Sequence, residues 1–218
     1  MSENYWKEPL RWNTTAEQQG RRIQVFCASM ADVFDPEAPA GQLDRLWNLI
    51  RATPSLDWQL LTKRPERIRE SLPDDWGLGW PNVWLGTSVE DSQVIERIGH
   101  LVNVSAIVHF LSLEPLIGPI PDLPLSRIDW VIVGGESGPD ARFMNPGWVR
   151  DIRRQCRTFG VAFFFKQWGG VRKREAGRKL DGRFYNEMPR PENKALQIQN
   201  EINARKDRQG TLFPRADL

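Results

Sequence analysis

The chain has 218 residues, of which 40% are apolar and 27% charged, and these proportions exclude a disordered or fibrous protein. The net charge is +2, but residues 171–218 hold 12 basic against 7 acidic side chains, so the C-terminal part is basic and the rest mildly acidic. Two cysteines, two histidines and no long apolar stretch exclude a disulfide framework, a zinc motif and a transmembrane helix, and predict a cytoplasmic protein.

Residues 1–20 are polar and are interpreted as a lead-in segment. Short apolar runs, each followed directly by polar residues, predict six strands: 23–28, 58–62, 83–88, 107–113, 130–134 and 161–166. Apolar spacings of three and four, with proline and glycine signals at the ends, predict helices at 41–51, 65–72, 92–102 and 146–159. The proline-containing segment 115–127 predicts a surface loop in place of a helix.

The spacing between these strands favours right-handed βαβ crossovers over hairpins, and therefore a parallel α/β sheet. About six units are too few for a closed TIM-like barrel, which leaves an open doubly wound sheet or a partial (β/α) barrel. Polar residues follow every strand, which favours the partial barrel, because all of its strand ends face one mouth. We expect a lead-in at 1–20, the barrel at 21–170, and a basic part at 171–218 with an Asp-Gly hairpin at 178–183 and a flexible tail.

The carboxyl ends of the strands carry the candidate catalytic residues. Glu90, Glu114 and Glu136 close three consecutive strands, and Lys63 and Lys166 end two others, so the five are expected at one mouth. Interleaved acids and bases suit a zwitterionic ligand, such as an amino-acid moiety, or acid–base catalysis. Repulsion among the three carboxylates is expected either to raise the pKa of at least one of them or to bring a cation between them, which Lys63, Arg64 or Lys166 could supply. The structural alternative is a ring of salt bridges that closes the mouth.

Further polar residues and glycines at the same strand ends are expected to bind a ligand: Ser29, Asp32, Thr62, Arg64, Ser88, Ser112, Gly134, Gly135, Ser137 and Gln167. Consecutive backbone amides in the Gly-Gly-Glu-Ser-Gly motif at 134–138 can cup an anion, or the glycines can serve a tight turn alone. The cations of the motif at 62–65 stand at a helix start, which attracts phosphate or carboxylate; a solvated helix start is the alternative. His109, Cys27 and Cys156 are interpreted as core residues, and no metal ligands are expected.

The order and spacing of several stretches resemble a known family: 9–12, 29–34, 61–67, 82–90, 112–116, 130–139 and 163–169. From about Leu10 to Pro189, the chain is similar to the phage gene-product 37/68 family, also described as three-Cys-motif proteins and as domain of unknown function 5131. The resemblance implies an uncharacterised phage or prophage protein.

Members of that family typically begin with a cysteine-rich segment that ends in a CxxC element. Ahead of a partial barrel, this layout is similar to that of radical S-adenosylmethionine enzymes, in which three cysteines hold an iron–sulfur cluster. The resemblance therefore implies a 4Fe–4S cluster only in longer relatives, none bound by this chain, and S-adenosylmethionine as the cofactor to consider. We expect a truncated form over a natural short form, because a barrel without its first strand has an exposed edge; whether the truncated form is active or inactive is left open.

The leading hypothesis is thus a truncated relative of radical S-adenosylmethionine enzymes, with an unknown small-molecule substrate at the strand ends. The alternative hypothesis is a nucleic-acid-binding accessory protein of a phage or mobile element, which would use the basic C-terminal part and exposed tryptophans. The resemblance also suggests a three-Cys-motif partner protein encoded nearby. No membrane partner is expected.

Overall fold

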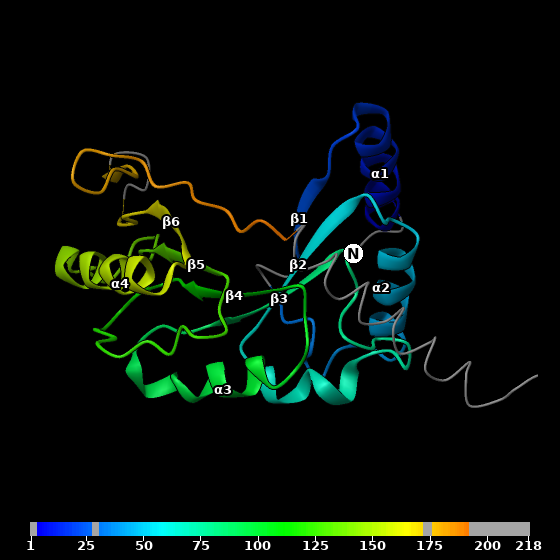
Figure 1. Cartoon of the computed structure of the whole chain (residues 1–218), viewed down its shortest axis with the longest axis horizontal. Helices are drawn as coiled ribbons and strands as arrows, with labels where there is room; N and C mark the ends of the chain where they lie inside the picture. Colours follow the sequence, from blue (N-terminus) through cyan, green and yellow to red (C-terminus); the bar gives the residue numbers. More distant parts are fainter. Residues whose placement is uncertain (1–3, 28–30, 172–175, 192–218) are drawn as a thin grey trace, which may run out of the picture.

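The computed structural model describes residues 4–27, 31–171 and 176–191, and its centre is one sheet of six strands (Figure 1). The strands are β1 (Ile23–Cys27), β2 (Leu56–Thr62), β3 (Val83–Ser88), β4 (Val108–Leu113), β5 (Trp130–Gly134) and β6 (Ala162–Gln167). All neighbours pair in parallel, and the order in the sheet is the order in the chain. A doubly wound sheet would reverse this order at a switch point, so the partial (β/α) barrel is confirmed.

Four α-helices follow one another around one side of the curled sheet, while the segment after β6 runs over part of the opposite side, where Met188 packs on the sheet (Figure 1). The helices are α1 (Glu8–Gln19), α2 (Gln42–Arg51), α3 (Glu96–Val102) and α4 (Pro146–Phe159). The helix predicted at 65–72 consists of two 3-10 turns, Pro65–Arg67 and Arg69–Ser71, and the one at 92–102 begins with a third such turn, Ser92–Val94. None of the helices in the described part of the chain is long and apolar enough to cross a bilayer.

The expected lead-in at 1–20 is instead largely helix α1, which packs beside β1 and β2. Its buried positions are Pro9, Asn13 and Ala16, too few and too polar to form an apolar stripe. The Asn13 side chain binds Glu17 at 2.7 Å and accepts a hydrogen bond of 2.9 Å from the backbone N–H of Ser55. A polar contact thus attaches the helix to the turn before β2, which is why hydrophobic periodicity does not reveal it.

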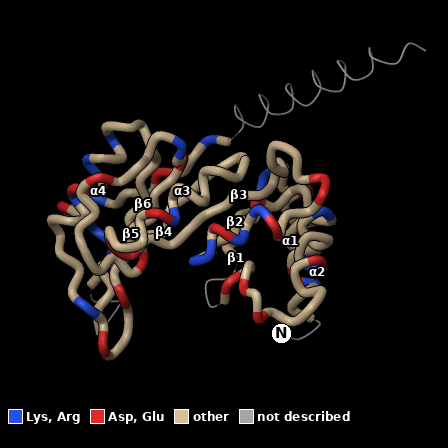
Figure 2. Tube along the Cα trace, turned by 90° about the horizontal axis from the view of Figure 1, so that it is seen from below, with Lys and Arg blue, Asp and Glu red and all other residues tan. Residues whose placement is uncertain are grey.

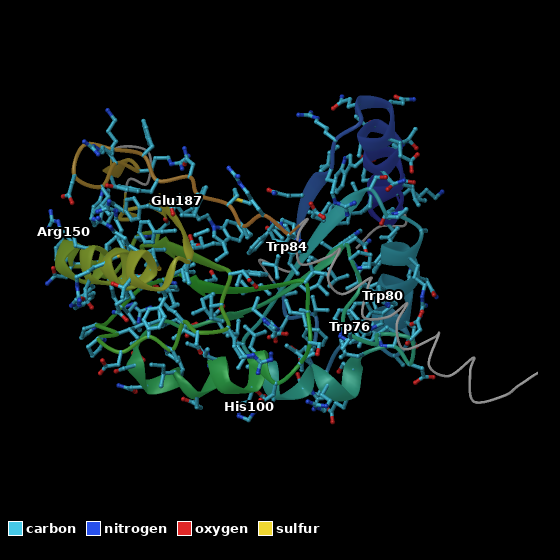
Figure 3. The ribbon with its side chains drawn as sticks, viewed as in Figure 1. Trp76, Trp80, Trp84, His100, Arg150 and Glu187 are labelled. Carbon is cyan, nitrogen blue, oxygen red and sulfur yellow. The ribbon has the colours of Figure 1, made fainter. Side chains whose placement is uncertain are left out.

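The two faces of the sheet have different partners. Residues such as Val83 and Leu85 point to the helices and belong to the main core, whereas Trp84 between them points to the inner face. A second buried cluster covers that inner face: Trp84, Ile107, Val108, Phe110, Trp130 and Ile132. Figure 3 shows Trp84 near the middle of the sheet. The alternation fixes which strand-end residues point to the inner face.

The loop at 115–127 contains no helix, as predicted, but it is a buried cover for the sheet and does not merely cross the surface. Its buried apolar side chains are Leu116, Ile120, Leu123 and Leu125. Gln155 of α4 fastens it, since its amide accepts a hydrogen bond from Leu123 N and donates one to Ile120 O, both at 2.8 Å.

The chain after β6 protects the edge of the sheet. Phe165 N binds Tyr185 O at 3.0 Å and Glu187 N binds Phe163 O at 3.2 Å, so 185–187 runs antiparallel beside β6. The predicted Asp-Gly hairpin is present: Asp181 and Gly182 both have positive φ, and Leu180 and Arg183 exchange two backbone hydrogen bonds of 3.0 Å. At the other edge, β1 pairs only with β2 among the strands of the described residues.

Candidate functional site

Polar side chains gather at the carboxyl ends of the strands, on the inner face of the sheet. Trp84 and Phe110 point to that face, so Ser88, four residues after Trp84, and Ser112, two residues after Phe110, point there too. These two serines are register partners and both are buried. By the same alternation, the inner positions at the strand ends are Lys63, Ser88, Ser112, Glu114, Gly134 and Lys166. We call this set, with Glu90, the strand-end rim.

Glu90 is the first fixed carboxylate of the rim. Its Oε1 lies 2.6 Å from Lys63 Nζ, and its Oε2 accepts a hydrogen bond of 3.0 Å from Arg97 of α3. Arg97 also donates to the carbonyl oxygen of Ser88 at 3.1 Å, so one guanidinium joins α3 to the end of β3. The side chain of Glu90 is only 12% exposed, while that of Lys63 is 56% exposed. Arg97 therefore fixes the position of the Glu90 carboxylate, while its other partner, Lys63, is accessible to solvent.

Glu114 repeats this arrangement one strand further along. Its Oε2 accepts a hydrogen bond of 2.7 Å from Lys166 Nζ, and its Oε1 accepts one of 3.1 Å from Gln167 Nε2. Gln167 is buried, and its amide also reaches the Gly135 carbonyl and Ser137 Oγ, at 3.3 and 3.2 Å. Glu114 is 21% exposed and Lys166 44%. Figure 2 shows acidic and basic positions next to one another along the arc of the strands.

Glu136 is bound by an arginine, Arg142, whose charge also interacts with that of Glu90. Arg142 binds it with two guanidinium hydrogen bonds, of 2.7 and 2.9 Å, and with its backbone N–H at 3.0 Å. These hydrogen bonds, first of all those from the guanidinium, lower the pKa of Glu136 to about 2. The cation that compensates Glu136 is therefore Arg142, six residues further along the same loop, and not Lys63, Arg64 or Lys166.

A second polar cluster stands at the end of β2. Asp32 accepts hydrogen bonds from Thr62 Oγ1, Lys63 N and Arg64 Nη1, at 2.7, 2.9 and 3.2 Å. Arg64 also lies 3.5 Å from Asp35. Thr62 and Arg64 are thus held by carboxylates, which favours a structural role for the motif at 62–65 over an anion site. Ser29, the remaining polar residue expected after β1, lies outside the described residues.

The glycines after β5 serve close packing between two loops. A Cβ atom on Gly135 would lie 1.9 Å from the carbonyl oxygen of Trp168, and one on Gly169 would lie 2.1 Å from that of Glu136. Gly135 N binds Gln167 O at 3.0 Å and Gly138 N binds Gly170 O at 3.3 Å. Since these amides already have acceptors within the protein, the structure favours the turn interpretation over an anion cup. On Gly134, a Cβ would approach Glu114 Oε1 to 3.0 Å, so this glycine leaves room for that carboxylate.

The thiols and histidines show no metal-binding arrangement. Burial raises the pKa of Cys27 to about 11 and that of Cys156 to about 12, so both stay protonated at neutral pH. His109 is buried and its Nε2 lies 2.8 Å from Val104 O, in agreement with its interpretation as a core residue. Within the described ranges, no group of three or more His, Cys, Asp or Glu side chains could hold a metal ion. Two separate, protonated thiols do not fit a three-cysteine iron–sulfur cluster.

The predicted site residues therefore fall into separate groups. The inner face brings Glu90 together with Lys63, and Glu114 with Lys166 and Gln167. Asp32 pairs with Arg64, and Glu136 pairs with Arg142, whose charge also interacts with that of Glu90. Sequence reasoning missed Arg97 and Arg142, although Arg97 follows Glu90 by seven residues and Arg142 follows Glu136 by six. A search of the sequence for an arginine within seven residues after each glutamate would have found both.

Comparison with known proteins gives one family and no characterised relative. Neither a curated protein nor a solved structure matches the chain. A family model described as protein of unknown function (DUF5131) matches residues 1–189. Since this match covers most of the 218 residues, the chain belongs to the DUF5131 family.

Proposed function

We propose that the protein binds a small zwitterionic ligand with an amino-acid moiety at the strand-end rim, and that S-adenosylmethionine is the first candidate. The observation that carries the proposal is the presence of two similar ion pairs, Glu90 with Lys63 and Glu114 with Lys166. The two glutamates follow the neighbouring strands β3 and β4, which end beside Ser88 and Ser112. The carboxyl ends of parallel strands are where ligands of this fold class bind.

A zwitterionic ligand can insert into either ion pair, Glu90 with Lys63 or Glu114 with Lys166, by binding the glutamate and the lysine separately. Arg97 and Gln167 hold the two carboxylates independently of the lysines, so Glu90 and Glu114 keep their positions if a lysine moves away. Both lysines are about half exposed, so a released lysine stays hydrated, whereas the largely buried carboxylate needs a new cation in its place. A ligand ammonium can then replace a lysine at its glutamate, while the ligand carboxylate binds the released lysine.

The kinship with radical S-adenosylmethionine enzymes and the phage association are part of this proposal, and the sequence resemblance supports them. S-adenosylmethionine combines an amino-acid group with a positive sulfonium, which suits a rim that presents more than one carboxylate. No radical step is assigned to this chain, because its two thiols do not fit the cluster that such chemistry uses.

The test is isothermal titration of the full chain with S-adenosylmethionine, methionine and adenosine. We expect the first two to bind and adenosine, which lacks the zwitterion, to bind far more weakly. Glu114→Gln should weaken binding roughly tenfold or more, the usual effect of losing a charge-assisted hydrogen bond. Asp75→Asn is the matched control, since Asp75 is an exposed carboxylate paired with Arg51 away from the rim. Equal affinity for adenosine and methionine, or equal losses in the two variants, would contradict the proposal.

Nucleic-acid binding is the second candidate, and charge is the observation that favours it. Residues 171–218 carry 12 basic against 7 acidic side chains, and α4, which packs beside β6, contains four arginines: Arg150, Arg153, Arg154 and Arg157. A phosphate-binding surface releases counterions, so affinity for single- or double-stranded DNA should fall steeply as salt rises. Fluorescence anisotropy with a labelled oligonucleotide measures this. Binding that is absent at low salt would eliminate this candidate.

A further inference from the structure

An open groove lies at the opposite end of the sheet from the strand-end rim. It has a volume of about 830 Å³, within the range of small-molecule sites. Its walls come from the starts of β4 and β6, from residues 125–129 ahead of β5, from the C-terminal half of α4, and from residues 187–191. Figure 3 shows Glu187 beside β6, on the segment that forms one wall. None of the residues predicted from the sequence to bind a ligand lines this groove.

The two acidic side chains of the groove accept backbone hydrogen bonds, whereas two of its arginines have no acidic partner among the described residues. Asp129 accepts a hydrogen bond of 2.8 Å from His109 N, and Glu187 accepts one of 3.0 Å from Phe163 N. Arg157 lines the groove from α4 and Arg190 from the segment 187–191; both are exposed, and neither lies within ion-pair distance of an acid among residues 4–27, 31–171 and 176–191. The groove therefore presents guanidinium groups that a bound anion would neutralise.

A third guanidinium is held in position on the same wall. Arg153 stands four residues before Arg157 in α4, so the two lie on one face of the helix. It stacks over the ring of Tyr185, with its Cζ 4.4 Å from the ring centroid. Two or three arginines match the charge of a phosphate monoester, which is −1.5 to −2 at neutral pH, better than that of a single carboxylate.

The remaining lining of the groove is apolar. Val108, Ile128, Ala162 and Met188 form part of it, and the ring of Phe159, which is 56% exposed, stands at its edge. An aromatic side chain left open to solvent beside arginines offers a stacking face for a flat ring. Cys156 also lines the groove, but burial and the charge of Glu187 keep its thiol protonated, which argues against metal binding there.

We propose that this groove is a second binding site, for a phosphate monoester carried on a flat ring, of the kind found in a nucleoside monophosphate. Arg157 and Arg190 bind the phosphate from the two walls, and Phe159 stacks on the ring. The inference does not depend on the function proposed for the strand-end rim, because the two sites share no residue.

The test is isothermal titration of the full chain with adenosine monophosphate, adenosine and inorganic phosphate. We expect the monophosphate to bind at least roughly tenfold more tightly than either fragment, since only it uses both the arginines and the ring. Arg157→Ala should weaken binding roughly tenfold. Arg154→Ala is the matched control: Arg154 is exposed on the same helix, pairs with Asp151 and does not line the groove, so its loss should change affinity by less than about twofold.

Two further measurements ask whether the phosphate comes from a free nucleotide or from a nucleic-acid end, and whether the groove binds independently of the strand-end rim. A 5′-phosphorylated oligonucleotide that binds while its 5′-hydroxyl counterpart does not would show that a nucleic-acid end is an alternative source of the same chemistry, and would support the site. Glu114→Gln should leave monophosphate binding unchanged. The proposal is overturned if neither the monophosphate nor the phosphorylated oligonucleotide binds, if inorganic phosphate binds as tightly as the monophosphate, or if Arg154→Ala and Arg157→Ala weaken binding equally.

Discussion

Replacing Gly135 by alanine tests whether the glycines after β5 serve packing or ligand binding. The new Cβ would lie 1.9 Å from the carbonyl oxygen of Trp168 and 2.7 Å from its carbonyl carbon. Both are backbone atoms, so the loops after β5 and β6 must separate to admit the methyl group. That separation also strains the hydrogen bond of 3.0 Å between Gly135 N and Gln167 O.

The expected cost follows from these two effects. Overpacking of a well-packed site costs about 1–3 kcal/mol, and loss of one backbone hydrogen bond costs about 1 kcal/mol. We therefore expect Gly135→Ala to lower the free energy of unfolding by about 2–4 kcal/mol. Gly134→Ala is the comparison: its Cβ would approach Glu114 Oε1 at 3.0 Å, but a side chain can rotate away, so the expected loss is less than about 1 kcal/mol.

Urea denaturation followed by circular dichroism measures both changes. The midpoint for Gly135→Ala should fall by about 1 M or more with an unchanged slope, since stability and not the exposed surface changes. Gly99→Ala serves as a control, because a Cβ there meets nothing within 4 Å in helix α3 and alanine favours helix. A Gly135→Ala protein that unfolds within about 0.5 kcal/mol of the parent would refute the packing explanation and favour an anion cup.

Three further predictions concern packing and ionisation. Gly86→Ala should cost about 1–3 kcal/mol, because its Cβ would lie 2.3 Å from the ring of Phe110, and a double-mutant cycle with Phe110→Leu should show coupling of about 1 kcal/mol in denaturation. Arg142→Ala should raise the pKa of Glu136 from about 2 toward its ordinary 4.5, measured by carboxyl NMR. Cys27, with its pKa near 11, should react with a disulfide reagent about 100-fold more slowly than a free thiol at mildly alkaline pH.

The sign of the Glu136 effect follows from the direction of its pKa shift. A carboxyl whose pKa is lower in the folded state stabilises the fold above its unfolded value, here 4.5, and this contribution is lost as pH falls toward about 2. An unchanged Glu136 titration in Arg142→Ala would contradict the ion pair. Additive effects of Gly86→Ala and Phe110→Leu would contradict the ring contact. A Cys27 rate equal to that of free cysteine would contradict the raised pKa of this partly buried thiol.

The sheet could be predicted from the sequence because its strands are short apolar runs with sharp ends. The bounds of β3 and β5 match the predicted ones, and α4 also does, since Pro146 begins it and Gly160 ends it with φ of 68°. Helix α1 could not be found in this way, because its attachment through Asn13 depends on a backbone amide 42 residues away. The partial barrel, with its strands in chain order, could be predicted because there are about six βα units and polar residues follow every strand.

The rim was predictable only in part. A two-residue period places Ser88 and Lys166 on the inner face, but periodicity does not say which cation reaches which acid. Lys63 lies beside Glu90 because β2 and β3 are neighbours in register, and Arg97 reaches Glu90 because α3 packs against β3. Such pairings are tertiary contacts, which local patterns do not contain.

A crystal structure of the full chain soaked with S-adenosylmethionine tests the central claim most directly. We predict that the ammonium group of the ligand lies within hydrogen-bond distance of Glu90 or Glu114, with Lys63 or Lys166 displaced onto its carboxylate. Electron density for the ligand away from these strand ends, or an empty rim with both ion pairs intact at saturating ligand, would contradict the account.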